Sequence, residues 1–155
     1  MRLSKNFVLS EITRSNTAKR LGIDNEPTKK DLENIQRLIT NILQPLRNHL
    51  GPIRISSGYR NKELNRAIGG STKSQHCKGE ALDIQFWKEG QMCNKEVYDW
   101  IIDNAVEFDQ MINEFDFSWI HISLKKSNNR REVLEAYKDK DGDTKYRFAP
   151  DIITL

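Results

Sequence analysis

The amino-acid sequence predicts an α+β fold: a single domain in which a small antiparallel sheet has its helices packed on one face. Three observations support this prediction. The chain shows both helical periodicity and strand-like alternation, the two kinds of segment do not alternate strictly, and 155 residues suit one domain. No internal repeat, low-complexity stretch or linker rich in proline, glycine or serine divides the sequence. We therefore expect residues 1–155 to form one domain.

The strongest helical signal lies in residues 28–50, where apolar side chains recur at spacings of three and four positions. Thr28 followed by Asp31 resembles a capping box and marks the start of this helix. Pro45 predicts a kink or a restart, because proline lacks the amide hydrogen that a helix uses. Gly51 ends the helix, which we interpret as scaffold.

Four shorter elements complete the scaffold. Residues 53–56 alternate between apolar and polar side chains and are predicted to form a strand, as are residues 109–113. Two short helices are expected over residues 60–68 and 95–106, and Asn94 is the expected N-cap of the second.

Two further strands, 81–86 and 119–124, each carry one metal-binding residue type in the middle of their polar face. Because successive side chains of a strand face opposite sides, Asp83 and His121 lie opposite the apolar residues of their strands. His76 lies in the loop that leads into the first strand, so the three residues can converge if the strands share a sheet. Two imidazoles and one carboxylate suit Zn²⁺, and three protein ligands leave a fourth position for water. From spacing alone, a hydrogen-bonded strand histidine beside a surface carboxylate is the alternative.

Composition and charge exclude several classes of protein. The net charge of +3 is too small to indicate a nucleic-acid partner, and acids interrupt the basic residues of 138–143. Apolar runs of about three residues exclude a membrane span, and the first residues lack the apolar segment of a secretory signal. Cys77 and Cys93 form no C-x-x-C pair, so we expect reduced thiols and no thiolate zinc site. We expect a monomer that is cytoplasmic on synthesis and binds neither nucleic acid nor membrane.

Several motifs lie in an order that is specific to one protein family. They are S-G-Y-R at residues 57–60, S-x-H-x-x-G-x-A-x-D at residues 74–83 and W-x-H-x-S at residues 119–123. With them the sequence resembles the zinc D-alanyl-D-alanine carboxypeptidase family, and most closely its phage- and prophage-type peptidoglycan peptidases. The fold implied is that of Hedgehog signalling domains and vancomycin-resistance dipeptidases. The resemblance is clearest over residues 7–135 and leaves residues 136–155 as a C-terminal tail.

The resemblance implies one Zn²⁺ per chain, held by three ligands: His76, Asp83 and His121. Members of the family have a catalytic carboxylate shortly before the last histidine, and some place it where this chain has Ser118. That departure leaves the catalytic base open. Glu114 is the first candidate and Asp116 the second; either could instead be a solvated turn residue.

The resemblance also implies residues that contact the substrate. Arg60 would stabilise the tetrahedral oxygen or bind a substrate carboxylate, although an arginine paired with a nearby acid is the alternative. Ser74 and Gln75 would hydrogen-bond the substrate or a metal ligand. Trp119 would form a wall against which the substrate stacks, or would be a half-buried strand aromatic.

The function implied is hydrolysis of peptide bonds in peptidoglycan stem peptides. The enzyme would be a zinc metallopeptidase, either a D-Ala-D-Ala carboxypeptidase or an endolysin-type endopeptidase that a phage lysis system releases to the cell wall. A catalytically inert zinc-binding module for cell-wall recognition is the alternative, because position 118 lacks the carboxylate.

Overall fold

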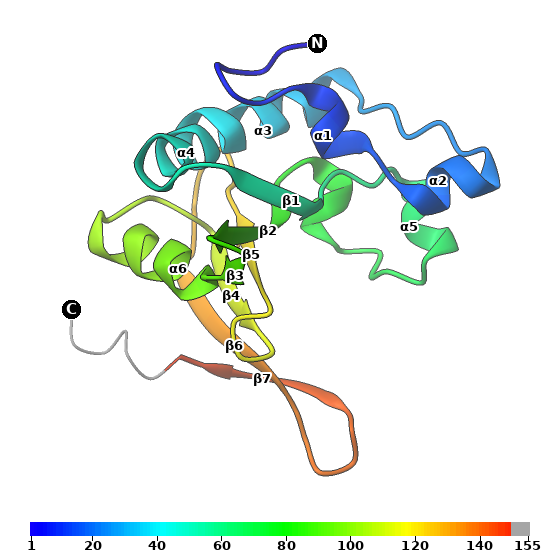
Figure 1. The fold of residues 1–155 in the computed structure, drawn as a ribbon. Helices are drawn as coiled ribbons and strands as arrows, with labels where there is room; N and C mark the ends of the chain where they lie inside the picture. The colour runs from blue at the N-terminus through cyan, green and yellow to red at the C-terminus, as the bar shows by residue number, and fades with distance from the viewer. Residues whose placement is uncertain (150–155) are drawn as a thin grey trace.

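A seven-stranded sheet organises the chain in a computed structural model that describes residues 1–149 (Figure 1). Its strands are β1 (Ile53–Ser57), β2 (Ala81–Lys88), β3 (Gln91–Met92), β4 (Gln110–Glu114), β5 (Trp119–Ser123), β6 (Glu132–Lys138) and β7 (Thr144–Phe148). The strands lie in the order β1-β2-β5-β4-β6-β7, and β3 pairs with β2. The metal-binding residue types of β2 and β5 therefore lie on neighbouring strands, as the sequence predicts.

One strand pair departs from the predicted antiparallel sheet. All pairs are antiparallel except β4 and β6, which run parallel. The reason is the chain path: β5 runs antiparallel to β4, and the chain then crosses to the far side of β4 before it turns back into β6. The fold class is α+β as predicted, and its sheet is mixed.

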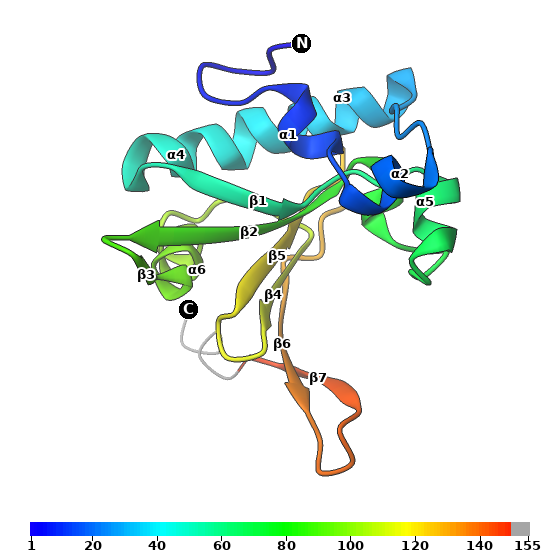
Figure 2. The same cartoon turned by 45° about the vertical axis from the view of Figure 1, so that its right-hand side comes forward.

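The helical elements are short apart from one long segment. They are α1 (Leu9–Thr13), α2 (Asn16–Leu21), α3 (Lys29–Leu38), the π-helical turn η1 (Ile39–Leu43), α4 (Gln44–Leu50), α5 (Lys62–Ala67), the 3₁₀ turn η2 (Gln75–Lys78) and α6 (Asn94–Asp103). Figures 1 and 2 show α3 and α4 lying along the same side of β1 and β2. Among residues 1–149, no helix combines the length and the apolar character that a membrane span needs.

The long helical segment α3-η1-α4 matches the helix predicted over residues 28–50. The Thr28 hydroxyl accepts the backbone N–H of Asp31 at 3.1 Å and caps its start. Pro45 is the second residue of α4, and the wider π-helical turn directly before it takes the place of the predicted kink. The apolar stripe is almost fully buried: Ile35, Leu38, Ile39, Ile42, Leu43 and Leu46. This segment covers one face of the sheet and leaves the other face for polar side chains.

Two predicted helix starts are wrong by one or two residues. The helix predicted from residue 60 begins at Lys62, with Asn61 as its N-cap, so Arg60 lies in the loop before it. Asn94 is the first residue of α6 and not its N-cap. Its buried side chain instead accepts the N–H of Phe86 at 2.8 Å and donates to the carbonyl oxygen of Phe117 at 2.7 Å. Asn94 thus connects α6 to β2 and to the β4–β5 turn.

The segment predicted to be a C-terminal tail contributes to the sheet. Residues 136–138 form the end of β6, and β7 pairs with β6 in antiparallel register. Both strands extend away from the helices (Figure 2). The last part of the predicted tail, residues 150–155, lies outside the described residues.

Candidate metal centre

Strand register places the predicted site residues on one face of the sheet. Asp83 of β2 is paired with His121 of β5, which is paired with Ile112 of β4. Glu114, at the end of β4, is paired with Trp119 of β5. Residues directly opposite each other on neighbouring strands point to the same side. This polar face lies opposite the helices α3 and α4.

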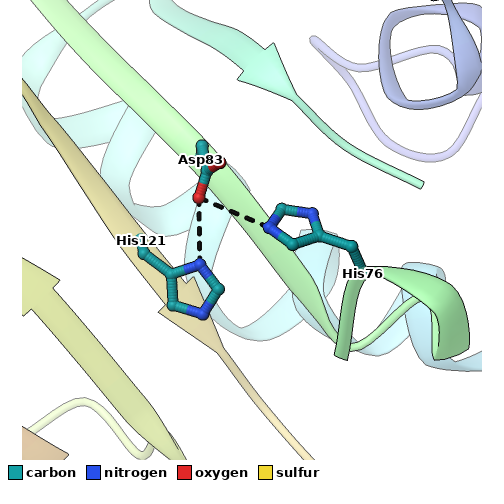
Figure 3. A group of neighbouring side chains, drawn as sticks. All are labelled: His76, Asp83 and His121. Atoms are coloured by element: carbon teal, nitrogen blue, oxygen red, sulfur yellow. Dashed lines mark hydrogen bonds and ion pairs between the residues drawn. The ribbon is translucent and has the colours of Figure 1, made fainter. Parts of the chain in front are cut away.

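His76, Asp83 and His121 converge on one point (Figure 3). His121 Nδ1 lies 2.9 Å from Asp83 Oδ1, and His76 Nε2 lies 3.4 Å from the same oxygen. One donor atom from each residue lies within 4.8 Å of the other two. The side chains of His76, Asp83 and His121 are 5%, 19% and 13% exposed, so the group is screened from bulk water yet reachable.

A backbone carbonyl determines which nitrogen of His76 can bind a metal ion. His76 Nδ1 lies 2.8 Å from the carbonyl oxygen of Gly58. Because a carbonyl only accepts hydrogen bonds, Nδ1 carries a hydrogen, which leaves Nε2, on the side of Asp83, as the nitrogen that can bind a metal ion. A side chain at position 58 would collide with the backbone oxygen of Ile12. Only glycine therefore allows the chain at position 58 to pack this closely against Ile12. The sequence singles out Gly58 as part of the S-G-Y-R motif but assigns it no role, and the structure places its carbonyl oxygen against His76.

The loop that carries His76 is shaped by the residues on either side of it. Ser74 is the N-cap of η2, and its hydroxyl accepts the N–H of His76 at 3.2 Å. Gly79 ends this turn with a φ of +72°, and a Cβ there would collide with the carbonyl oxygen of Asp31. These contacts turn the chain sharply from His76 into β2.

The donor set fits a zinc ion. Zinc is bound by imidazole nitrogens and carboxylate oxygens, and catalytic sites use three protein ligands. Burial raises the pKa of Asp83, but the hydrogen bond with His121 and the neighbouring His76 imidazole outweigh burial and hold the pKa below its ordinary value. Asp83 is therefore ionised at neutral pH, as a metal ligand must be. The group of His76, Asp83 and His121 could hold one metal ion.

Glu114 is a buried carboxyl that lines the same cavity as the metal group. Its residue is 8% exposed, and no hydrogen bond or ion pair connects its side chain to another of residues 1–149. Burial, together with the charge of Asp83, raises the pKa of Glu114 to about 7, against a smaller lowering effect of His121. A perturbed carboxyl in a cleft, with a pKa near neutrality, is typical of a general acid or base.

Asp116, the second candidate base, does not lie at the metal group. Phe115, Asp116 and Phe117 all have positive φ angles, and they form the turn that connects β4 to β5 beyond the end of the sheet. Asp116 is exposed and lines a different cavity, together with Asp99. Ser118 donates its hydroxyl hydrogen to the carbonyl oxygen of Phe115 at 2.7 Å. Of the two candidates, the structure brings only Glu114 to the cavity of the metal group.

The remaining predicted site residues line the same cavity, whose volume is about 760 Å³. Arg60 contacts the Ser74 hydroxyl through Nη2 at 3.4 Å, and no acid among the described residues lies within ion-pair distance of it. Its buried Nε has no hydrogen-bond partner there either. The alternative of an arginine paired with an acid is therefore not what the structure shows. The Trp119 ring packs against Phe115, with the ring centroids 5.5 Å apart.

A second buried carboxylate in this cavity was missed by sequence reasoning. Asp109 is 1% exposed and accepts two hydrogen bonds from the Arg130 guanidinium, at 3.1 and 2.8 Å. It also accepts the side-chain amide of Gln75 at 3.1 Å, and Lys125 Nζ lies 3.6 Å from it. No sequence spacing connects residues so far apart. Lys138 and Tyr146 also line the cavity, and both lie beyond the motifs of the resemblance.

Comparison with known proteins identifies the family. The family model for Peptidase M15 matches residues 5–123, which is more than half of the chain and includes His76, Asp83 and His121. A search of curated proteins finds no match. The chain therefore belongs to the Peptidase M15 family, a family of zinc-dependent metallopeptidases that resemble D-Ala-D-Ala carboxypeptidases.

Proposed function

We propose that this protein is a zinc-dependent peptidase that hydrolyses peptide bonds of peptidoglycan stem peptides. Its metal ligands are His76, Asp83 and His121, and its general base is Glu114. The observation that carries this proposal is that an unpaired, buried carboxyl shares one cavity with three converging metal-ligand donors. Membership of a metallopeptidase family supports it.

Glu114 moves the proton in this mechanism. A bound zinc ion supplies a Lewis acid that polarises the scissile carbonyl group and makes water more acidic. The Glu114 carboxylate accepts the proton of the attacking water and later donates it to the leaving amine. A carboxyl with a pKa of about 7 can do both near neutral pH, because it takes up and releases a proton there.

Arg60 binds the negative charge of the substrate or of the reaction. Its guanidinium lines the cavity and is free of acidic partners among residues 1–149, so it can donate to a substrate carboxylate or to the tetrahedral oxygen. Ser74 contacts both Arg60 and the backbone of His76, and it thereby orients the arginine relative to the metal group. Gln75, the next residue, brings its side-chain amide to the cavity, and Trp119 forms an aromatic wall.

The charge of the cavity suits an acidic peptide. Six basic side chains line it: Arg60, Lys73, Lys78, Lys125, Arg130 and Lys138. Four acids line it as well, and one of them, Asp109, pairs with Arg130, so five basic side chains remain against three acids, of which Asp83 belongs to the metal group. Stem peptides carry several carboxylates, so this excess of cations favours them as substrates.

The bond cleaved and the cellular setting follow from the resemblance. We propose either removal of the terminal D-Ala or cleavage within the stem or its cross-bridge. The setting we propose is endolysin-type, with a monomeric enzyme that is made in the cytoplasm and reaches the cell wall through a phage lysis system, without a nucleic-acid or membrane partner.

Digestion of purified peptidoglycan tests the proposal. Zinc-loaded protein, with the metal content measured, is incubated with sacculi and with stem peptides that end in D-Ala, and the products are identified by mass spectrometry. We expect new amino termini or free D-Ala, loss of this activity with a chelator, and recovery when Zn²⁺ is added back. A zinc-loaded protein that releases no product from any of these substrates would instead be the inert recognition module.

A further inference from the structure

The β6–β7 hairpin, residues 132–148, lines one side of the cavity with Lys138, Thr144 and Tyr146. Register pairs Glu114 of β4 with Ala136 of β6, and Ala136 with Tyr146 of β7. Side chains paired in this way lie on one face, so Tyr146 and Glu114 lie on the same face with only a small alanine between them. The hairpin therefore brings its own side chains to the catalytic face of the sheet.

Lys138 and Tyr146 present unused hydrogen-bond donors to this cavity. Lys138 Nζ donates to the Thr144 hydroxyl at 2.7 Å and lies 5.2 Å from the centroid of the Phe115 ring. No acid within the described part of the chain forms an ion pair with Lys138, and the Tyr146 hydroxyl has no hydrogen bond there. Tyr146 is 55% exposed, and the partial burial of its hydroxyl together with the charges of Glu114 and Asp83 raises its pKa, so the hydroxyl keeps its hydrogen.

On the opposite face of the same hairpin, one cation is paired with an acid. Arg147 lies 3.1 Å from the Glu135 carboxylate and 4.4 Å from the centroid of the Tyr137 ring. Its charge is therefore already neutralised within the protein. Lys145 lies on this opposite face as well and does not line the cavity, whereas Lys138 does.

This wall also lies outside the region that defines the family. The family model ends at residue 123, before β6 begins at Glu132. The metal group belongs to the shared region, whereas Lys138 and Tyr146 belong to a segment that the family model does not include. A difference in substrate preference between this chain and other members can arise there.

We propose that Lys138 and Tyr146 form a subsite that binds a carboxylate of the peptide substrate on the Glu114 side of the metal group. This inference rests on the proposed function for the identity of the peptide. An ammonium group and a phenol hydroxyl both donate hydrogen bonds, and a carboxylate is their natural acceptor. Thr144 and Phe115 hold Lys138 in place, which lowers the entropy lost when the carboxylate binds. Arg60, which follows β1 in the chain, serves the other side of the metal group.

A thermodynamic cycle tests the subsite. The probes are the pentapeptide L-Ala-γ-D-Glu-L-Lys-D-Ala-D-Ala, the same peptide amidated at its C-terminus, and the same peptide amidated at the free carboxylate of D-Glu. Binding is measured by calorimetry on the zinc-loaded Glu114→Gln protein, which we expect to bind without cleavage, with and without Lys138→Met. We expect one of the two amidations to weaken binding about 10-fold when Lys138 is present and by less than about twofold in Lys138→Met.

A matched variant and a second measurement complete the test. Lys145→Met, on the opposite face of β7, should leave binding unchanged, and Tyr146→Phe should weaken binding of the same carboxylate by a smaller factor. Amidation effects that are equal with and without Lys138, or no binding of any probe at about 1 mM, would overturn the subsite. Hydrolysis of the same peptides by the unmodified protein is assayed separately. If the peptides are cleaved but the amidation effect does not depend on Lys138, the subsite alone is refuted. If the amidation effect depends on Lys138 but no peptide is cleaved, the peptidase activity alone is refuted.

Discussion

Two carboxyl groups at opposite ends of β4 lie in the same cavity and behave differently. Asp109, directly before the strand, receives hydrogen bonds from Arg130 and Gln75, whereas Glu114, the last residue of the strand, receives none from the described residues. Burial raises the pKa of both. For Asp109 the hydrogen bonds and charge of Arg130 outweigh burial and hold the pKa at about 2, while for Glu114 the pKa rises to about 7.

The difference shows that partners, rather than burial, determine what a buried carboxyl can do. Asp109 is 1% exposed and Glu114 is 8% exposed, so their burial is similar. Asp109 stays ionised and connects the loop of Gln75 to Arg130, which makes it a positioning residue next to the metal group. Glu114 is free to exchange a proton, which is the property a general base needs.

The largest effect should come from substituting the metal ligands, which lie in the same cavity as Asp109 and Glu114. We expect the protein purified without chelator to contain about one Zn²⁺ per chain, and Asp83→Ala to contain almost none, because three ligands leave none to spare. His76→Ala and His121→Ala should behave in the same way. Atomic absorption after gel filtration measures the zinc content. Asp109→Asn is the matched control and should retain zinc; full zinc retention in Asp83→Ala would exclude the proposed ligand set.

Neutralising Glu114 tests whether this carboxyl acts as the general base. We expect Glu114→Gln to keep its zinc and its fold and to lower turnover by about 10²-fold or more, which is the usual effect of losing a general acid–base group. Turnover on a stem peptide is measured at saturating substrate concentration. Asp116→Asn, in the adjacent turn, should leave turnover unchanged. The opposite result for the two variants would transfer the role of base to Asp116.

Neutralising Asp109 should reduce stability more than chemistry. Asp109→Asn leaves Arg130 and Lys125 without their shared carboxylate, and we expect a loss of about 2 kcal/mol in the free energy of unfolding, less than for a fully buried pair because Arg130 is half-exposed. Because the pKa of Asp109 is lowered in the folded state, its contribution is present above about pH 4 and is lost as the pH falls toward about 2. Urea unfolding at pH 7 and at pH 3 measures this. A difference between the two proteins that is as large at pH 3 as at pH 7 would show that the carboxylate charge is not the cause.

The smallest effect concerns the cost of burying Glu114. Because its pKa is raised in the folded state, the metal-free protein should lose stability as the pH rises from about 4.5 to about 7, since the folded state holds the proton more tightly. We expect Glu114→Gln to remove this loss and to be about 1–2 kcal/mol more stable than the unmodified chain at pH 8, relative to pH 4.5. Denaturant unfolding of both chelator-treated proteins at the two pH values measures it. Parallel pH profiles would contradict the raised pKa.

Local patterns in the sequence were sufficient for the scaffold and for part of the site. The apolar stripe of residues 28–50 and the alternation in 81–86 and 119–124 depend only on the periods of helix and strand, and the structure contains all three elements. The same alternation puts Asp83 and His121 on the polar faces of their strands, and the structure pairs them directly. The family resemblance, which depends on motif spacing, is confirmed by the family match.

The remaining features of the sheet and of the site depend on contacts between distant segments, and only the tertiary structure determines these contacts. The parallel pairing of β4 with β6, the position of β7 and the pairing of Asp109 with Arg130 follow from strand order and register, which no local period encodes. The choice between Glu114 and Asp116 as neighbour of the metal group depends on a turn of three residues with positive φ, a conformation that Phe115 and Phe117 rarely adopt. The hydrogen bond from His76 to Gly58 likewise exists only because η2 folds back against the end of β1. Sequence periodicity therefore determined that Asp83 and His121 lie on the polar faces of their strands, and long-range packing determined which other residues they meet.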